Sequence, residues 1–299
     1  MQDQQLHGKT ALSIELAKRI NGEIISSDSM QIYKDMQIGT AKVTPEEMEG
    51  IKHYLVDCVY PNERYTVSDF KRDSEKAIEE ILSKRKVPII VGGTGLYINS
   101  LIYGIDYVEY ETDLEYRNAL MEKMETTDGL NECYEEAKRI DPEATEKISP
   151  NDKKRISRIL EIYKETGKTK TELEIESKAN GVKYDFRKFV ITWDRQKLYD
   201  RIDLRVDLMI EQGLVQEVKD LLEKYRSYPT AMQALGYKEV KEYLDGLLSY
   251  EEMIDKIKKE TRHYAKRQLT WFRKNDDYIW LNAEDGVDTN VERIVKAFE

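Results

Sequence analysis

The sequence predicts an α/β fold in which a helical domain is inserted into a parallel-sheet core. Short apolar runs alternate with helical patterns through the first hundred residues, as is typical of parallel α/β units. The strand pattern disappears from about 108 to 182, where charged helices are broken by Gly and Pro, and it then returns. We therefore expect residues 1–107 and 183–299 to form the core and 108–182 to form the insertion.

The elements of the core follow from spacing and capping residues. Apolar residues at fourfold spacing predict a helix over 9–20. Ser68 can cap a helix that runs to about residue 86 with Leu82 on its inner face. The predicted strands are 23–26, 54–59, 87–91, 189–193 and 278–281. The other predicted helices of the core are 195–212, 214–225, 250–275 and 288–298.

Composition excludes several classes of protein. No apolar run approaches the ~18 residues of a membrane span, so we expect no membrane contact. Only Cys58 and Cys133 occur, which excludes a disulfide framework and fits a reducing cytoplasm. The formal net charge of −10 slightly disfavours nucleic acid as a partner, but basic segments at 153–158 and 256–274 could still bind RNA.

Gly8-Lys9-Thr10 at the start of the first helix matches the end of a phosphate-binding P-loop. Lys9 would meet the phosphates, and the Thr10 hydroxyl is suited to Mg²⁺. The full motif asks for glycine where Asp3 stands and for a buried strand before the loop, whereas residues 1–7 are few and polar. We expect residues 1–7 to be a wrong start, a truncation or a frame-shifted remnant that does not form this strand. By itself, such a tripeptide is more often a plain helix start.

Six segments together carry a resemblance to a known family. They are Asp28-Ser29-Met30-Gln31-Ile32-Tyr33, Ile38-Gly39-Thr40-Ala41-Lys42, Gly92-Gly93-Thr94-Gly95-Leu96-Tyr97, Arg201-Ile202-Asp203-Leu204-Arg205-Val206-Asp207, Ala234-Leu235-Gly236-Tyr237-Lys238-Glu239 and Thr261-Arg262-His263-Tyr264-Ala265-Lys266-Arg267-Gln268-Leu269-Thr270-Trp271-Phe272-Arg273. In this order they resemble the tRNA dimethylallyltransferases, and the resemblance covers almost all of the chain after residue 7. The absence of a zinc-finger pattern indicates the bacterial type.

The resemblance implies a P-loop NTPase-like core and a tRNA-modifying activity. A dimethylallyl group would pass from dimethylallyl diphosphate to the exocyclic N6 of the adenine 3′ to the anticodon. The implied partners are the tRNA anticodon loop and dimethylallyl diphosphate, with Mg²⁺ as cofactor. Gly8, Lys9 and Thr10 would bind the diphosphate, with Thr10 also on the metal, and the enzyme would be a cytoplasmic monomer.

The same resemblance implies three catalytic residues. Asp28 follows a strand at the carboxyl edge of the sheet and would act as the general base, although it could instead merely cap the next turn. Thr94 lies in a glycine bend and would sit beside the reacting groups, unless the bend is a simple turn. Arg205 would hold the departing diphosphate. Spacing alone favours a salt-bridge lattice of Arg201 and Arg205 with Asp203 and Asp207 on an exposed helix.

The resemblance also implies a set of tRNA contacts. They are Asp28, Ser29, Met30 and Gln31, then Arg117, and in the insertion Lys154, Arg155, Ile156, Ser157 and Arg158. Spacing in the insertion places Ile156 and Tyr163 on an inward stripe, with Lys154 and Arg158 on the opposite face. Charge runs are more often solvated faces than phosphate contacts, but the resemblance of this segment to the family's tRNA-contacting segment favours phosphate contacts here.

Three other functions compete with this interpretation. An adenylate isopentenyltransferase would use a free nucleotide, but it would need neither the insertion nor the basic helices. A catalytically impaired tRNA-binding relative is suggested by the incomplete P-loop and opposed by Asp28, Thr94 and Arg205. A small-molecule kinase is supported only by Gly8-Lys9-Thr10.

Overall fold

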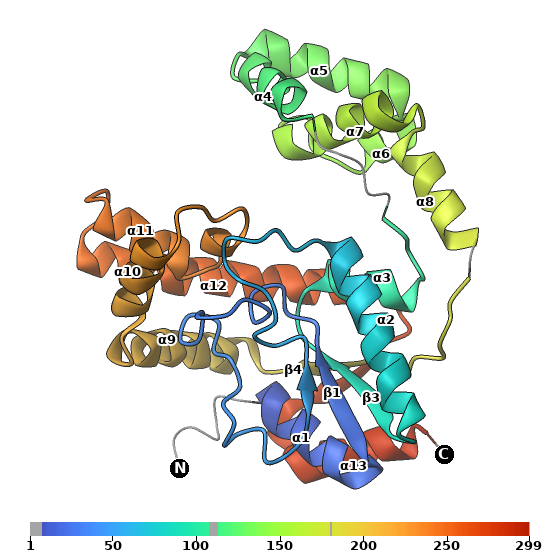
Figure 1. Ribbon diagram of the computed structural model, residues 1–299, viewed down its shortest axis with the longest axis vertical. Helices are drawn as coiled ribbons and strands as arrows, with labels where there is room; N and C mark the ends of the chain where they lie inside the picture. Colours follow the sequence, from blue (N-terminus) through green and yellow to red (C-terminus); the bar gives the residue numbers. More distant parts are fainter. Residues whose placement is uncertain (1–7, 108–112, 180, 299) are drawn as a thin grey trace. The chain divides into compact units, whose positions relative to one another are not determined.

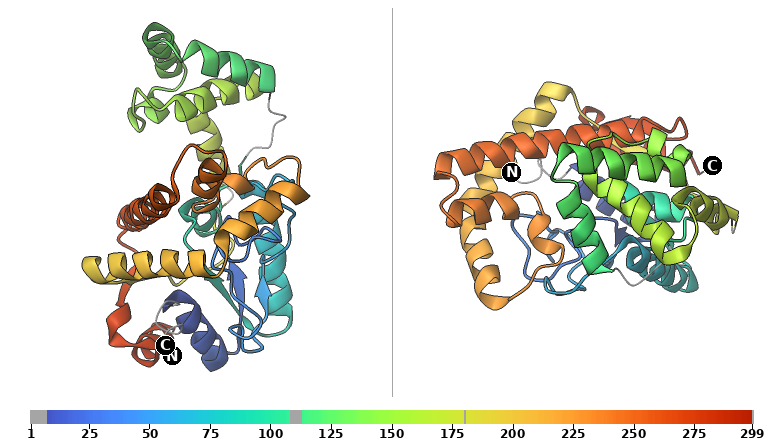
Figure 2. Two further views of the ribbon diagram at one scale, coloured as in Figure 1. Left: turned by 90° about the vertical axis from the view of Figure 1, so that its left-hand side faces the viewer. Right: turned by 90° about the horizontal axis from the view of Figure 1, so that it is seen from above.

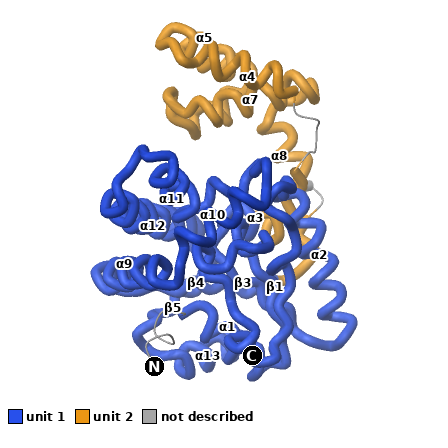
Figure 3. The backbone as a smooth tube through the Cα atoms, turned by 60° about the vertical axis from the view of Figure 1, so that its left-hand side comes forward, with its two compact units in different colours: residues 1–98, 186–299 blue, residues 99–185 orange. Residues whose placement is uncertain are grey.

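A computed structural model describes residues 8–107, 113–179 and 181–298, which form two compact units (Figure 3). The second unit is Asn99–Asp185, and the chain on either side of it forms the first unit. The predicted insertion, 108–182, falls inside the second unit. The expectation about residues 1–7 lies outside the described residues.

The strands of the first unit form two parallel sheets (Figure 1). Strands β1 (Gly22–Ser26), β2 (His53–Tyr54) and β3 (Val87–Val91) pair in the order β2-β1-β3, with β1 fully buried in the middle. Strands β4 (Phe189–Thr192) and β5 (Ile279–Asn282) form the second sheet. The parallel arrangement is the one expected of an α/β core.

Helices of the first unit pack on both sheets and on one another. They are α1 (Gly8–Ile20), α2 (Val67–Ser83), α3 (Gly95–Ile102), α9 (Arg195–Glu211), α10 (Leu214–Lys224), α11 (Tyr237–Leu244), α12 (Tyr250–Phe272) and α13 (Val287–Lys296). Helices α1 and α13 lie side by side (Figures 1 and 2) and share a core with residues of β3, β4 and β5. A larger core is formed by the four helices α9, α10, α11 and α12 together with the segment around Tyr33.

Three sequence predictions for this unit are wrong in detail. Helix α2 is capped by Thr66 and not by Ser68, because Thr66 and Asp69 form a reciprocal capping box. Leu82 is 48% exposed and does not face the core. The strand predicted over 54–59 ends at Tyr54, since Leu55 and Asp57 have positive φ and leave the extended conformation.

The regular elements in the described residues of the second unit are all helices, and residues 99–102 at its start are the end of α3. Its helices are α4 (Leu114–Lys123), α5 (Thr127–Ile140), α6 (Pro142–Glu146), α7 (Lys153–Thr166) and α8 (Lys170–Ala179). Ile156, Ile159 and Leu160 on α7 are buried against α5 and form the core of the unit, as the stripe on this helix predicts. Tyr163 was expected on the same stripe but is 43% exposed. No helix in the described part of the chain is both long and apolar enough to span a membrane.

Candidate active site

Two loops meet at the carboxyl ends of β1 and β3, and they carry Asp28 and Thr94. The backbone pairing of these strands continues beyond their ends, with Ser27 N donating to Val91 O at 2.8 Å and Thr94 N donating to Ser27 O at 3.3 Å. The amide of Ser29 donates to Thr94 Oγ1 at 3.1 Å. The structure thus brings together two predicted catalytic residues that lie 66 positions apart, from 28 to 94.

The Asp28 carboxylate is oriented by its own loop. Its Oδ1 accepts hydrogen bonds from the amides of Met30 at 2.9 Å and Gln31 at 3.3 Å. Within the described residues, Oδ2 accepts no hydrogen bond. Asp28 therefore caps the turn, as one interpretation proposed, and the same geometry holds one oxygen available to accept a proton.

The glycine bend after β3 is packed too closely for side chains. A Cβ on Gly92 would lie 2.3 Å from Ser27 Oγ, and one on Gly95 would lie 2.4 Å from Trp271 Nε1. A Cβ on Gly93 would lie 2.0 Å from Gln268 Nε2, which donates to Gly93 O at 2.9 Å. These glycines therefore allow β1 and α12 to approach the bend.

Lys9, Arg201 and Arg205 form a cluster of cations next to Asp28. Burial lowers the pKa of Lys9, Asp28 partly opposes this, and Arg205 lowers the pKa further. The pKa of Arg205 is lowered by burial and by Arg201, and it is raised by Asp28 and Glu47. Lys9 is crowded by protein yet exposed to solvent, so a ligand can reach it. An excess of positive charge in crowded surroundings suits a diphosphate.

The arginines of α9 are available because the aspartates of this helix pair elsewhere. Asp203 forms an ion pair with Arg262 of α12, and Asp207 Oδ1 lies 2.6 Å from Lys258 Nζ, also on α12. Among the described residues, Arg201 and Arg205 have no ion pair within 4.0 Å. The salt-bridge lattice within α9, which spacing alone favoured, is therefore not formed.

Trp193 connects the start of α1 to this cluster. The Arg201 guanidinium lies 4.0 Å from the centroid of the Trp193 ring, and a Cβ on Gly8 would lie 3.6 Å from the same ring. Burial lowers the pKa of Arg201. The contact with an aromatic face holds the guanidinium in place without neutralising it.

Several residues at this site were not singled out as site residues by sequence reasoning. Tyr264 and Gln268 lie four residues apart on one face of α12. Burial raises the pKa of Tyr264, as does Asp28, while Gln268 and Thr94 lower it. Arg201 is the third residue of this kind. The fourfold spacing of Arg201 from Arg205, and of Tyr264 from Gln268, is the sequence signal that could have identified these residues.

Thr10 has the chemistry expected of a Mg²⁺ ligand. It lies on the first turn of α1 next to Lys9 and is half-buried. Protein sites for Mg²⁺ commonly supply only one or two ligands, and substrate phosphates and water complete the octahedron. The described residues contain no group of three His, Cys, Asp or Glu side chains that could hold a metal ion.

The other predicted residues of the Asp28 loop have structural partners. Gln31 Nε2 donates to Thr40 O at 3.2 Å and to Ala41 O at 3.3 Å, which ties the loop to the next turn. Met30 packs partly buried against the larger core, and Ser29 Oγ accepts a hydrogen bond from Thr94.

The predicted tRNA residues of the second unit differ in exposure. Lys154 and Arg155 are exposed, Arg158 is half-buried, and Ile156 and Ser157 are buried. Arg117 donates from Nε and Nη2 to the two carboxylate oxygens of the buried Glu161, at 2.9 and 2.6 Å. Thus Lys154, Arg155 and Arg158 can present charge to a partner, whereas the side chains of Ile156 and Ser157 support the helix.

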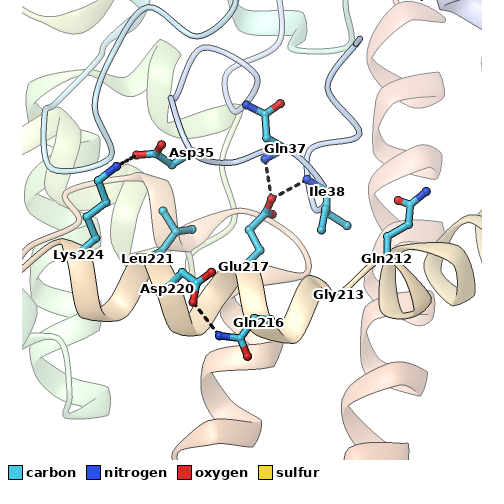
Figure 4. A pocket seen from close by; sticks show the side chains of 10 residues that line it. All are labelled: Asp35, Gln37, Ile38, Gln212, Gly213, Gln216, Glu217, Asp220, Leu221 and Lys224. Carbon is cyan, nitrogen blue, oxygen red and sulfur yellow. Dashed lines mark hydrogen bonds and ion pairs between the residues drawn. The ribbon is translucent and has the colours of Figure 1, made fainter.

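A pocket of about 520 Å³ lies elsewhere in the first unit, at the corner between α9 and α10 (Figure 4). Its charged lining residues are Asp35, Glu217, Asp220 and Lys224, and it includes none of the predicted site residues. Three carboxylates and one ammonium are unsuited to a diphosphate, so the cation cluster is the better candidate site.

Comparisons with known proteins agree on one family. The family described as IPP transferase matches residues 31–275. The chain is 51% identical to a tRNA dimethylallyltransferase of Acetivibrio thermocellus, over 97% of this chain and 92% of the relative. It is 50% identical to one of Lachnoclostridium phytofermentans, over 93% and 89%.

Two solved structures are similar along most of the chain. The first is a tRNA isopentenylpyrophosphate transferase from Bacillus halodurans, with a TM-score of 0.71, 40% identity, and coverage of 97% of this chain and 91% of that one. The second is a eukaryotic dimethylallyltransferase acting on tRNA, with a TM-score of 0.75, 34% identity, and coverage of 96% and 74%.

Proposed function

The chain belongs to the IPP transferase family, and from this premise we propose that it is a tRNA dimethylallyltransferase that uses dimethylallyl diphosphate. The acceptor is the exocyclic N6 of the adenine 3′ to the anticodon. The family resemblance and the P-loop-type α/β core with a helical insertion, both predicted from the sequence, are confirmed by the relatives and solved structures. The enzyme acts as a cytoplasmic monomer.

The observation that carries the proposal is a single oriented carboxylate beside three cations. Lys9, Arg201 and Arg205 can hold the diphosphate, and Arg205 can bind its oxygens in two places. Asp28 lies next to this cluster, with one oxygen available for the amine proton. An enzyme that transfers a prenyl group from an anionic leaving group to a weak amine nucleophile needs both parts.

The transfer balances with these residues. The bond between C1 of the prenyl group and the diphosphate oxygen breaks, and a bond from N6 to C1 forms. The N6 proton passes to Asp28, and the diphosphate leaves with its charge matched by the cation cluster. Thr94 keeps the Asp28 loop in place through Ser29. When bound, Mg²⁺ would neutralise part of the diphosphate charge, and the Thr10 hydroxyl would help to hold it.

Both units contribute residues suited to tRNA. The loop of Asp28 to Gln31 lies at the site, where an adenine taken out of its stack could be read. On α7, the exposed Lys154 and Arg155 and the half-buried Arg158 suit phosphate contacts, which position an RNA without reading its sequence. Arg117 supports α7 through its ion pair with Glu161, and it would contact the tRNA while this ion pair stays formed.

The test is prenyl transfer in vitro from labelled dimethylallyl diphosphate to an unmodified tRNA with adenine 3′ to the anticodon. Nucleoside mass spectrometry of the digested tRNA should find the prenyl group on that adenosine. A parallel reaction with AMP should give no product. Transfer to AMP alone would identify a free-nucleotide enzyme, and tRNA binding without transfer would identify an impaired relative.

A further inference from the structure

Glu217 on α10 holds a loop of the first unit through its backbone. Its Oε2 accepts hydrogen bonds from the amides of Gln37 and Ile38, both at 2.8 Å, and its Oε1 accepts one from Gly39 at 3.1 Å. Figure 4 shows the carboxylate directed at this loop. Three consecutive amides on one charged acceptor form a strong, directional attachment, because hydrogen bonds to charged groups are the stronger class.

The attachment is reinforced from the other side by Tyr237, the first residue of α11. The hydroxyl of the fully buried Tyr237 donates to Glu217 Oε1 at 2.5 Å. Gly39 lies so close to this ring that a Cβ would come within 2.4 Å of Tyr237 Cε2. The loop therefore rests flat on the tyrosine while its amides meet the carboxylate, and both contacts need Gly39.

Gln31 links the same loop to the general base. Its side-chain amide donates to Thr40 O and Ala41 O, directly after the residues that Glu217 holds. Its backbone amide donates to Asp28 Oδ1. A continuous series of hydrogen bonds thus runs from Glu217 through residues 37–41 and Gln31 to the carboxylate of Asp28. None of residues 37–41 belongs to a helix or strand, although the turn has hydrogen bonds of its own, from Ala41 N to Ile38 O at 2.9 Å and from Thr40 Oγ1 to Met36 O at 2.7 Å. These bonds hold the turn together, whereas Glu217 attaches it to α10.

We propose that Glu217 is a positioning residue for prenyl transfer, which acts by holding residues 37–41 and thereby the orientation of Asp28. The proposal rests on the proposed function. Both oxygens of the Glu217 carboxylate accept hydrogen bonds from the loop amides and the Tyr237 hydroxyl, so we assign it no contact with the substrate. The cations are carried by α1 and α9, so loss of this attachment should disturb the base and spare the binding of diphosphate.

The test compares Glu217→Gln with Asp220→Asn. Glutamine has the same size but only one acceptor oxygen and no charge. Its NH₂ group must face either the amides of Gln37 and Ile38 or the amide of Gly39, so at least one of the three hydrogen bonds is lost and the attachment should weaken. Asp220 lies on the same helix, and its carboxylate accepts from Gln216 at 2.7 Å and does not hold the loop. The single-turnover rate of Glu217→Gln should fall by about 10²-fold, as expected for a misplaced catalytic group, while Asp220→Asn should match the wild type.

Two further readouts separate positioning from general destabilisation. Pyrophosphate affinity should be unchanged in Glu217→Gln. Amide hydrogen exchange should speed up in peptides covering 28–42 and stay normal in the strands. Glu217→Asp, which keeps the charge, should recover part of the rate.

A wild-type rate in Glu217→Gln would overturn the proposal. So would a loss of rate that is matched by loss of pyrophosphate binding and by a general increase in exchange. If the wild-type protein transfers no prenyl group, the proposed function fails. Exchange over 28–42 then decides by itself whether Glu217 controls the Asp28 loop.

Discussion

Replacement of Asp28 by asparagine separates its proposed role as a general base from its hydrogen bonds in the turn. Asparagine keeps an Oδ1 that can accept from the amides of Met30 and Gln31, now at 2.9 and 3.3 Å, so the loop should keep its conformation. Only the charge and the basicity are lost. Alanine removes the base and both hydrogen bonds together, and the pair of variants therefore separates the two roles.

The expected magnitudes differ between activity and stability. A general base supplies about 10²–10⁴-fold in rate, equivalent to about 3–5 kcal/mol of activation free energy, and both variants should lose this. Two turn hydrogen bonds at about 0.5–1.5 kcal/mol each give about 1–3 kcal/mol of stability, which only alanine should lose. At about 2–4 °C per kcal/mol for a domain of this size, the melting temperature of Asp28→Ala should fall by several degrees.

The assay is single-turnover prenyl transfer at saturating tRNA and dimethylallyl diphosphate, with melting temperature and pyrophosphate affinity measured on the same samples. Pyrophosphate binding should not weaken, because Lys9, Arg201 and Arg205 are unchanged. A rate for Asp28→Asn within a few-fold of wild type would remove Asp28 from the proton transfer. Equal melting temperatures for the two variants would show that the turn hydrogen bonds contribute nothing to stability.

Three further outcomes are expected. Arg205→Lys should lower kcat/KM for dimethylallyl diphosphate by about 10–100-fold, since lysine cannot bind two oxygens at once, and an unchanged value would assign this arginine elsewhere. Pyrophosphate affinity should fall as pH rises through the pKa of Lys9, which burial places below its usual range, and Lys9→Arg should abolish this fall. Combined alanine substitution of Lys154, Arg155 and Arg158 should lower the log–log salt slope of tRNA binding by about 0.7–0.9 for each lost phosphate contact, whereas an unchanged slope would leave these residues a solvated face.

Local patterns predicted most elements of the core and the position of the two loops that carry Asp28 and Thr94. The two loops could be anticipated because parallel strands align their carboxyl ends, and both Asp28 and Thr94 follow such strands. The cap of α2 was missed by two residues because Thr66 and Ser68 are both good caps. Asp69 decides between them, since its side chain bonds back to the Thr66 amide.

Long-range contacts could not be predicted in this way. The partners of Asp203 and Asp207 lie on α12, more than 50 positions along the chain, and no local spacing reveals them. Without these partners, the nearest arginines on α9 are the obvious candidates, which made a local lattice the default interpretation. The early end of β2 could not be predicted for a different reason. Leu55 and Asp57 adopt positive φ, and no glycine in the sequence signals this conformation.

The glycine bend has a consequence for how freely this site can vary. At Gly92 a methyl group would meet the backbone of Ser27 at 2.5 Å, which can yield only if a strand shifts. At Gly95 it would meet the rigid indole of Trp271 at 2.4 Å, whereas at Gly93 it would meet only the end of the flexible Gln268 side chain. Tolerance to a small side chain is thus graded within four residues, and Gly93 is the position where variation could arise first. The cost there is the hydrogen bond that Gln268 donates to Gly93 O, so such a variant would loosen α12 from the bend and leave the sheet intact.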